Sequence, residues 1–306
     1  MGTRTERRRS SSRAEQALAT QRLRAPATIA NTARNARAEI DRHARWAPAR
    51  DALWQLLQRH LTNGARVAVL GAGNCDDLPL TRIADDSREV TLIDLDTHAV
   101  KGAVRRQPRR LRPRIGVIEH EVTNGAADTL ATAAVDTEVP VAPVIPESPL
   151  PGSPYDLVIG DLLYSQTLYP ALVDLDIPAV RTAAVLARYG PVLTRSIVAR
   201  LQISAPDGLV LHVHDPLAWW PGHHQPVALN QILAIAELNP QAAVRLAAGG
   251  RGPHDSDPRV ALTQFAIPIH ETALWRWPFA AHVDYLVCAT VTKARPLPRP
   301  PQRALG

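Results

Sequence analysis

The chain has 306 residues, 45% of them hydrophobic, and is therefore long enough to bury a full core. Its apolar runs are too short to span a membrane and its first residues lack a signal-peptide core, so the sequence predicts neither a membrane protein nor a secreted one. The two cysteines, Cys75 and Cys288, cannot build a disulfide framework and fit a reducing compartment. We therefore expect a cytoplasmic protein.

Positive charge is concentrated at the start of the chain. The net charge is +6, but residues 1–50 hold twelve arginines against four acidic residues, which leaves the remainder slightly negative. A nucleic-acid groove is usually basic throughout, so a nucleic-acid partner is possible but not favoured. Six further arginines lie within residues 105–114, and a solvated surface is the simplest interpretation. The scarcity of lysine is typical of a GC-rich bacterial genome, and the oligomeric state is not predicted.

Two terminal segments and a helical extension precede or follow the main domain. Residues 1–25 are rich in Arg and Ser and predict a disordered basic tail, and residues 296–306 form a Pro-rich tail. Residues 26–63 predict two helices, the first over roughly 26–45 and the second from near Pro48 to Asn63. The second helix carries one apolar stripe, formed by Leu53, Trp54, Leu56, Leu57 and Leu61.

The main domain, residues 64–295, opens with a strand that runs into a glycine turn. The apolar run 67–70 predicts a buried parallel strand, and Gly71 and Gly73 follow it at once. Asp94 ends the next strand, twenty-three residues after Gly71, where doubly wound folds place an acid on an adenosine ribose. A dinucleotide site would have a third glycine where this chain has Asp76. The Asp76 carboxylate would repel a pyrophosphate but suits a ligand with an ammonium group.

Further strands follow at ordinary spacings. Residues 115–118, 155–163 and 208–215 predict a third, fourth and fifth strand, and residues 285–292 a closing antiparallel one. Six prolines within residues 140–154 indicate an extended loop before the fourth strand. Residues 216–258 form a longer connection with one predicted helix near 227–238. We expect this whole connection to lie over the active site.

These motifs, taken in order, make the chain resemble the class I S-adenosylmethionine-dependent methyltransferases over roughly residues 50–293. The resemblance implies an α/β fold: a Rossmann-like, doubly wound, seven-stranded, mostly parallel sheet with an antiparallel closing strand and an N-terminal helical extension. It implies S-adenosyl-L-methionine as the cofactor and no metal. It also implies a set of cofactor-binding residues, namely Gly71, Gly73, Asn74, Asp76, Asp94, Leu95, Glu121, Val122 and Asp161.

Methyl transfer from a sulfonium needs a base only if the acceptor must lose a proton. The candidates at strand ends are Asp161, Tyr164 and His214, with His214 preferred because an imidazole titrates near neutral pH. Each of them is also a plausible hydrogen-bonded cleft residue. Asp215, His223 and His224 are weaker candidates for the base. His212 and His214 share one strand face, but no cysteine lies near them and a metal site is not predicted.

Aromatic residues suggest where an acceptor binds. Trp219 and Trp220, with His223, lie on a loop that follows the fifth strand, and we expect them to contact the substrate. Trp275 and Trp277 alternate on a predicted strand, for which core packing is the simpler interpretation.

The function predicted from these features is methyl transfer to an oxygen or nitrogen of a small molecule. The Pro-Pro-aromatic turn of base-methylating enzymes is missing after Asp161, and neither cysteine stands where a C5 nucleophile would be needed. Two alternatives stay open. One is an RNA or protein methyltransferase anchored by the basic N-terminus. The other is a non-catalytic or aminopropyl-transferring relative, for which Asp156 and Asp161 leave room.

Overall fold

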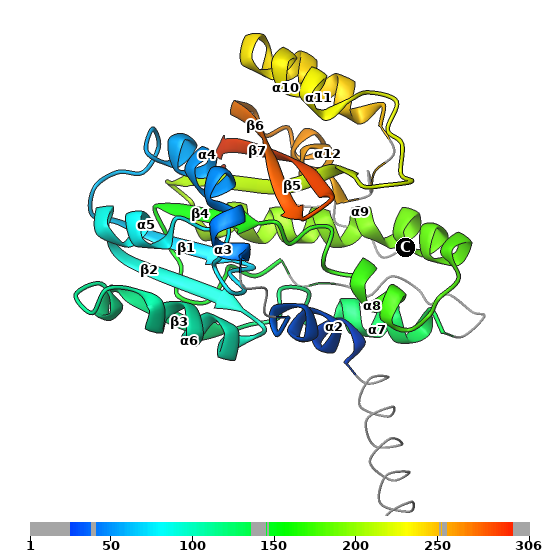
Figure 1. Cartoon of the computed structure of the whole chain (residues 1–306). Coiled ribbons are helices and arrows are strands. Elements are labelled where there is room, and N and C mark those ends of the chain that lie inside the picture. The colour runs from blue at the N-terminus through cyan, green and yellow to red at the C-terminus, as the bar shows by residue number, and fades with distance from the viewer. Residues whose placement is uncertain are drawn as a thin grey trace, which may run out of the picture.

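The computed structural model describes residues 25–37, 41–135, 145, 147–250, 252 and 256–295. The predicted Pro-rich tail, residues 140–144 and 146 of the Pro-rich loop, and all but the last residue of the basic tail lie outside these residues. A seven-stranded sheet with helices on both faces organises the described chain (Figure 1). In spatial order its strands are β3 (Ile115–Glu119), β2 (Ser87–Asp94), β1 (Ala65–Leu70), β4 (Leu157–Asp161), β5 (Leu209–Trp219), β7 (Val283–Lys293) and β6 (Ile269–Ala280).

Strand direction confirms the predicted fold class. β1 pairs in parallel with β2 and β4, β2 with β3, and β4 with β5. Only β7 runs against its neighbours, since it pairs antiparallel with both β5 and β6. The chain proceeds outward from β1 in one direction to β3 and then in the other direction from β4. This reversal next to β1 is the switch point at which open α/β sheets bind ligands.

Alternating side chains of the strands build two cores, because successive residues of a strand point to opposite faces. Val67 and Val69 pack on one face with α4 (Ala47–Leu57), α5 (Leu80–Asp86) and α6 (Thr97–Arg106). Ala68 and Leu70 pack on the other with α9 (Ala179–Ser204) and α12 (Pro258–Gln264). Both faces of β1 are therefore apolar, which explains why its sequence reads as one continuous apolar run.

The N-terminal extension differs from the prediction. In place of one helix over 26–45, α2 (Pro26–Asn35) and α3 (Arg42–Arg45) are separate, and α4 follows directly after Trp46. The Asn35 side chain lies against Gly73, whereas Arg45 and Trp46 donate hydrogen bonds to the Phe279 carbonyl at the end of β6. One straight helix cannot reach both places. α4 also stops at Leu57, earlier than predicted, although its stripe does face the core.

The connection after β5, residues 216–258, also differs from the prediction of one helix. It holds two helices, α10 (Leu229–Leu238) and α11 (Pro240–Ala248), because Asn239 caps α11 and Pro240 cannot continue α10. Ile232 and Ala243 pack on Leu217 and Leu286, so both helices cover the β5–β7–β6 end of the sheet. Figure 1 shows them at the top of the molecule, away from α2. No helix in the described part of the chain has the length and apolar character of a membrane span.

Candidate functional site

The turn after β1 requires glycine at its first position. Gly71 has φ +81°, and a Cβ there would stand 2.8 Å from the Asp161 carbonyl oxygen. Any side chain would therefore push β4 away from β1. Gly73 has φ +47°, and its Cβ would lie 3.2 Å from Asn35 Oδ1, so α2 packs closely on the same turn. The two glycines bring the ends of β1 and β4 and the end of α2 together.

Asp94 braces this turn. Its Oδ2 accepts a hydrogen bond from the Gly73 N–H at 2.8 Å, and its Oδ1 accepts one from the Asp96 N–H, also at 2.8 Å. Burial raises the pKa of Asp94, and the backbone N–H groups offset part of that rise. A carboxylate oxygen has more than one lone pair, so Asp94 keeps acceptor capacity toward the space beside the turn.

A cavity opens beside this turn, at the carboxyl ends of β1 to β4. It contains about 690 Å³ of empty space, part of which is open solvent. Of the predicted cofactor residues, those that line it are Gly71, Gly73, Asp94, Leu95, Glu121, Val122 and Asp161. Their contact with a cofactor stays a prediction, but the fold does bring them to one place.

The cavity also uses residues that the sequence did not single out. α2 covers it with Ala27, Thr28, Asn31 and Asn35, and the stretch after β4 adds Leu162, Leu163, Gln166 and Thr167. The Asp128 carboxylate holds the start of α2, accepting from the Ala27 N–H at 2.7 Å. The only signal in the sequence for this arrangement is that helices before the first strand commonly cover the cleft in the family that the chain resembles.

The electrostatics of the cavity are acidic. Asp161 is 4% exposed, and burial together with the nearby Asp77 raises its pKa well above the ordinary value. The pKa of Asp77 is raised to about 6, mainly by burial. Among the residues that line the cavity there is no arginine and no lysine. The site therefore holds carboxyl groups that no lining cation neutralises.

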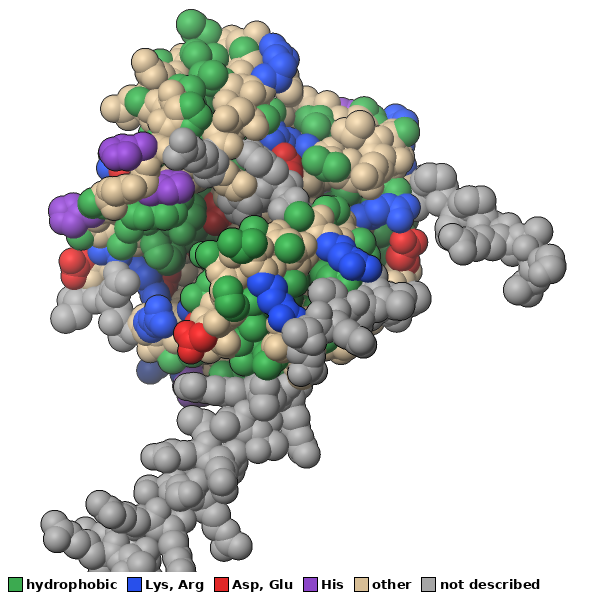
Figure 2. All heavy atoms as spheres, turned by 90° about the vertical axis from the view of Figure 1, so that its right-hand side faces the viewer, with side chains coloured by type: hydrophobic (Ala, Val, Ile, Leu, Met, Phe, Trp, Pro, Cys, Tyr) green, Lys and Arg blue, Asp and Glu red, His purple; other side chains and the backbone are tan. Residues whose placement is uncertain are grey.

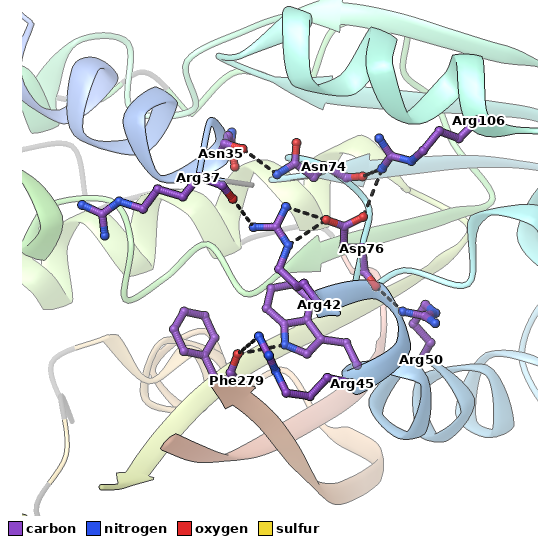
Figure 3. A network of polar contacts seen from close by, with 10 residues as sticks. Asn35, Arg37, Arg42, Arg45, Arg50, Asn74, Asp76, Arg106 and Phe279 are labelled. Atoms are coloured by element: carbon purple, nitrogen blue, oxygen red, sulfur yellow. Dashed lines mark hydrogen bonds and ion pairs between the residues drawn. The ribbon is translucent and has the colours of Figure 1, made fainter. Parts of the chain in front are cut away.

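Asn74 and Asp76, although predicted to bind cofactor, do not line the cavity. Asp76 accepts from Arg42 Nη2 at 2.6 Å and from Arg106 Nη2 at 3.1 Å, and its backbone carbonyl accepts from Arg50 (Figure 3). Asn74 donates to the Asn35 carbonyl at 2.9 Å. The charge of Asp76 is thus neutralised within the protein. Its predicted contact with an ammonium group stays a prediction, and these two arginines compete with it.

The arginine-rich segment around α6 is largely engaged with the protein itself. Arg110 pairs with Asp85, and Arg112 donates to the backbone carbonyls of Arg105 and Gln107. These contacts use the guanidinium groups locally, as expected of a solvated surface rather than a ligand-binding patch.

Tyr164 lies inside the protein, on the side of the sheet covered by α9. It is 2% exposed, and its hydroxyl forms a hydrogen bond with His212 Nδ1 at 2.6 Å. Burial raises the pKa of Tyr164 well above 10 and lowers the pKa of His212 to about 3. Tyr164 does not line the cofactor cavity. A neutral, buried tyrosine whose hydroxyl is already hydrogen-bonded to a neutral histidine is poorly suited to act as a base.

His214 is also internal. It is 3% exposed, does not line the cavity, and its Nε2 comes within 3.4 Å of Asp257 Oδ1. Burial lowers its pKa to about 4, and Arg259 opposes the effect of Asp257. The assignment of His214 as the catalytic base stays a prediction that this geometry does not favour.

Asp215, by contrast, is half-buried at the carboxyl edge of the sheet. Its Oδ1 accepts from Ser165 Oγ at 2.8 Å, burial raises its pKa to about 6, and its charge acts on Tyr285. No described cationic side chain forms an ion pair with it. The side of the molecule toward which β1 and β2 point in Figure 1 is hollowed in Figure 2, with acidic side chains (red) recessed between hydrophobic ones (green).

The predicted substrate residues Trp219, Trp220 and His223 lie at the far end of β5 and do not line the cavity. Trp220 and His223 stack on each other with ring centroids 3.8 Å apart, and the Trp219 Nε1–H donates to the Val227 carbonyl. Their contact with substrate stays a prediction. Trp275 and Trp277 are buried in the core, as the simpler interpretation expected.

Two residues at the other end of the cavity were not assigned a role from the sequence. His120 lines the cavity, and Arg200, which is 1% exposed, donates to its Nε2 at 2.7 Å. Glu121 lines the cavity but uses its carboxylate to cap the next turn, accepting from the Thr123 N–H at 2.8 Å and the Gly125 N–H at 2.5 Å. Arg200 lies eighty residues from His120, so no local pattern signals this pair.

Comparisons with known proteins are limited to overall structure, since no protein-family model matches the chain and no curated protein is significantly similar in sequence. Among solved structures, a SAM-dependent methyltransferase from Aquifex aeolicus matches with 10% identity and a TM-score of 0.40, over 84% of this chain and 94% of that one. A SAM-dependent methyltransferase from Methanosarcina mazei matches with 11% identity and a TM-score of 0.41, over 78% and 97%.

A third similar structure is an N-methyltransferase from Bradyrhizobium japonicum in complex with S-adenosyl-L-homocysteine. It matches with 10% identity and a TM-score of 0.39, over 80% of this chain and 85% of that one. At these identities and scores, the assignment of the fold depends on strand order and direction, and that of the site on the cavity itself.

Proposed function

We propose that the protein is an S-adenosylmethionine-dependent methyltransferase that acts on an oxygen or nitrogen of a small molecule. The observation that carries this proposal is the cavity at the switch point, which is lined by Asp94, Glu121 and Asp161 and, among the described residues, by no arginine or lysine. A dinucleotide would place its anionic pyrophosphate among these carboxyl groups. A cofactor with a sulfonium and an ammonium group is favoured there instead.

Each part of the cofactor has residues that fit it. Asp94 has acceptor capacity for the ribose hydroxyls, and the segment from His120 to Val122 offers polar groups to the adenine. Gly71 and Asp161 are the neighbours for the methionine portion, where the carboxyl group of Asp161 faces positive charge. When bound, S-adenosylmethionine supplies a methyl group that passes to a nucleophile as the carbon–sulfur bond breaks, so the leaving thioether needs no acid.

The acceptor would approach from the Asp215 side. Leu162 lines the cavity and packs in the same core cluster as Trp46 and Trp277, so the cavity borders the β5–β7 end of the sheet. Beyond it, Ser165 and Asp215 offer a hydroxyl and a carboxyl group. This arrangement supports Asp215 in orienting the acceptor or in receiving its proton, in preference to the internal Tyr164 and His214.

Calorimetry with S-adenosylhomocysteine and with NAD tests the proposal. We expect a saturable heat with the first and none with the second. Tight NAD binding without binding of the sulfonium series would overturn it. A screen with labelled S-adenosylmethionine against small-molecule extracts would then identify the acceptor. The two cysteines, Cys75 and Cys288, are both free and buried, which supports the proposed cytoplasmic location.

The basic N-terminus favours one alternative, an RNA or protein methyltransferase. Deleting residues 1–25 separates the two functions, because a small-molecule enzyme should keep its rate. An RNA enzyme should lose affinity and much of its salt dependence. Product formation from the decarboxylated donor alone would instead indicate an aminopropyl transfer.

A further inference from the structure

Arg200 is a buried cation near the cofactor cavity whose hydrogen bonds go to neutral acceptors. It lies on α9, is 1% exposed, and reaches under the sheet to the segment after β3. Its guanidinium donates to the Ser148 carbonyl at 3.0 Å, to the Val122 carbonyl, and to His120 Nε2 at 2.7 Å. The nearby carboxylate of Glu121 favours its charge. Burying a charged guanidinium costs free energy, so packing alone does not explain why an arginine stands at position 200.

The hydrogen bond from Arg200 determines the tautomer and the protonation state of the His120 imidazole. A guanidinium has only donors, so His120 Nε2 must present its lone pair. The single ring proton is then on Nδ1, and a second proton on Nε2 would place two donors head to head. Burial and Arg200 lower the pKa of His120, with only Glu121 acting in the opposite direction. His120 is therefore neutral, and in the described part of the chain no acceptor is found for its Nδ1–H.

We propose that Arg200 is a positioning residue that holds His120 as the Nδ1–H tautomer, so that His120 offers a hydrogen-bond donor to an adenine ring nitrogen. The adenine contact rests on the proposed function, whereas the tautomer of His120 is independent of it. His120 lines the cavity beside Glu121 and Val122. A donor at this position favours a purine whose ring nitrogen is unprotonated over one that carries a proton there.

Nitrogen-15 NMR of ring-labelled histidine tests the tautomer in the protein without ligand. In the wild type, His120 should show its proton on Nδ1 and stay neutral below the pH at which a free histidine titrates. In Arg200→Met the Nε2–H form should appear and the pKa should rise, and Arg200→Lys should restore part of the wild-type pattern. Arg195→Met is the matched control, because Arg195 lies on the exposed side of α9 over the Phe265 ring. An Nε2–H tautomer in the wild type would overturn the proposal even if the Arg200 variants do not fold.

Binding of deaza analogues of S-adenosylhomocysteine tests the ligand contact. One analogue, lacking the nitrogen that accepts from His120, should bind the wild type roughly three- to tenfold more weakly than the parent compound. The difference should vanish in His120→Phe. Equal losses in the wild type and His120→Phe would overturn the contact. A protein that binds no S-adenosylhomocysteine at all would overturn the proposed function, while the tautomer measurement would still stand.

Discussion

The carboxylate of Asp94 holds the N–H of Gly73 at 2.8 Å across twenty-one residues of sequence. The end of β2 therefore fixes the conformation of the turn that follows β1. Asp94, which we propose binds a ribose, therefore also stabilises the neighbouring glycine turn. Its removal should affect both the shape of the site and the affinity for ligand.

We expect Asp94→Ala to weaken S-adenosylhomocysteine binding by at least tenfold and to lower the free energy of unfolding by about 1–3 kcal/mol, since two backbone N–H groups lose their acceptor. Asp94→Asn should lose less stability, because one oxygen remains. Calorimetry and urea unfolding measure the two effects. Asp85→Asn is the control, since its surface pair with Arg110 contributes little. Full affinity in Asp94→Ala would exclude a ribose contact.

Affinity for the sulfonium cofactor should rise with pH. Burial and the nearby Asp76 raise the pKa of Asp77 to about 6, and burial and Asp77 raise the pKa of Asp161, so a protonated fraction persists near neutral pH. A bound cation favours the ionised form, and binding then releases a proton. S-adenosylhomocysteine carries no sulfonium and should show a weaker dependence between roughly pH 5 and 8. Calorimetry in two buffers measures the proton release, which Asp161→Asn should reduce. An identical pH dependence for both ligands would contradict this coupling.

The sheet could be predicted from the sequence because each strand beside β1 is an apolar run with a turn signal at its end. The positions of Tyr164 and Asp76 could not. Tyr164 follows Leu162, whose φ of +48° is a left-handed conformation that a leucine in the sequence does not signal. Asp76 is neutralised by Arg42 and Arg106, which lie thirty or more residues away. Both outcomes depend on tertiary contacts that leave no local pattern.

The full length of β5 could not be predicted for a related reason. β5 was predicted to end at Asp215 but continues to Trp219, after an irregularity in its pairing with β7 between His214 and Leu217. The extra length carries Trp219 and Trp220 away from the parallel part of the sheet. A strand that continues across a bulge gives no periodic signal in the sequence.

Tyr164→Phe should affect stability rather than methyl transfer. Removing the hydroxyl leaves His212 Nδ1 buried without a partner, which costs about 1–3 kcal/mol. Chemical unfolding should show this loss, and kcat should stay within a few-fold of the wild type. A loss of kcat of a hundredfold or more with unchanged stability would instead make Tyr164 a catalytic residue.

Two buried histidines should make the fold sensitive to acid. Their pKa values, about 3 for His212 and about 4 for His214, lie below the unfolded value of 6.5, so the unfolded state binds more protons. The free energy of unfolding is therefore highest, as far as these two histidines affect it, above pH 6.5. It decreases as the pH falls toward 4, by up to about 1.4 kcal/mol per pH unit for each histidine. Urea unfolding at pH 7 and pH 5 measures the slope.

His214→Phe isolates one of these histidines. Asp257, which lies 3.4 Å from His214 Nε2, also pairs with Arg259, so an apolar ring at position 214 should cost little stability at pH 7 and should reduce the acid sensitivity. Its rate of methyl transfer should be unchanged. Loss of activity without loss of stability would restore His214 as the base.

The final prediction concerns the acceptor. Asp215 is the half-buried carboxyl group at the carboxyl edge that has a hydrogen bond from Ser165 and no ion pair within the described residues. If it orients the acceptor, Asp215→Asn should raise KM for the acceptor found by screening by at least tenfold, with unchanged affinity for S-adenosylhomocysteine. If it receives the proton, kcat should fall instead, and the wild-type rate should decline as the pH drops below about 6, the pKa of Asp215. Asp207→Asn, at an exposed position before β5, is the matched control. An Asp215→Asn variant with wild-type kcat and KM would place the acceptor elsewhere on this edge of the sheet.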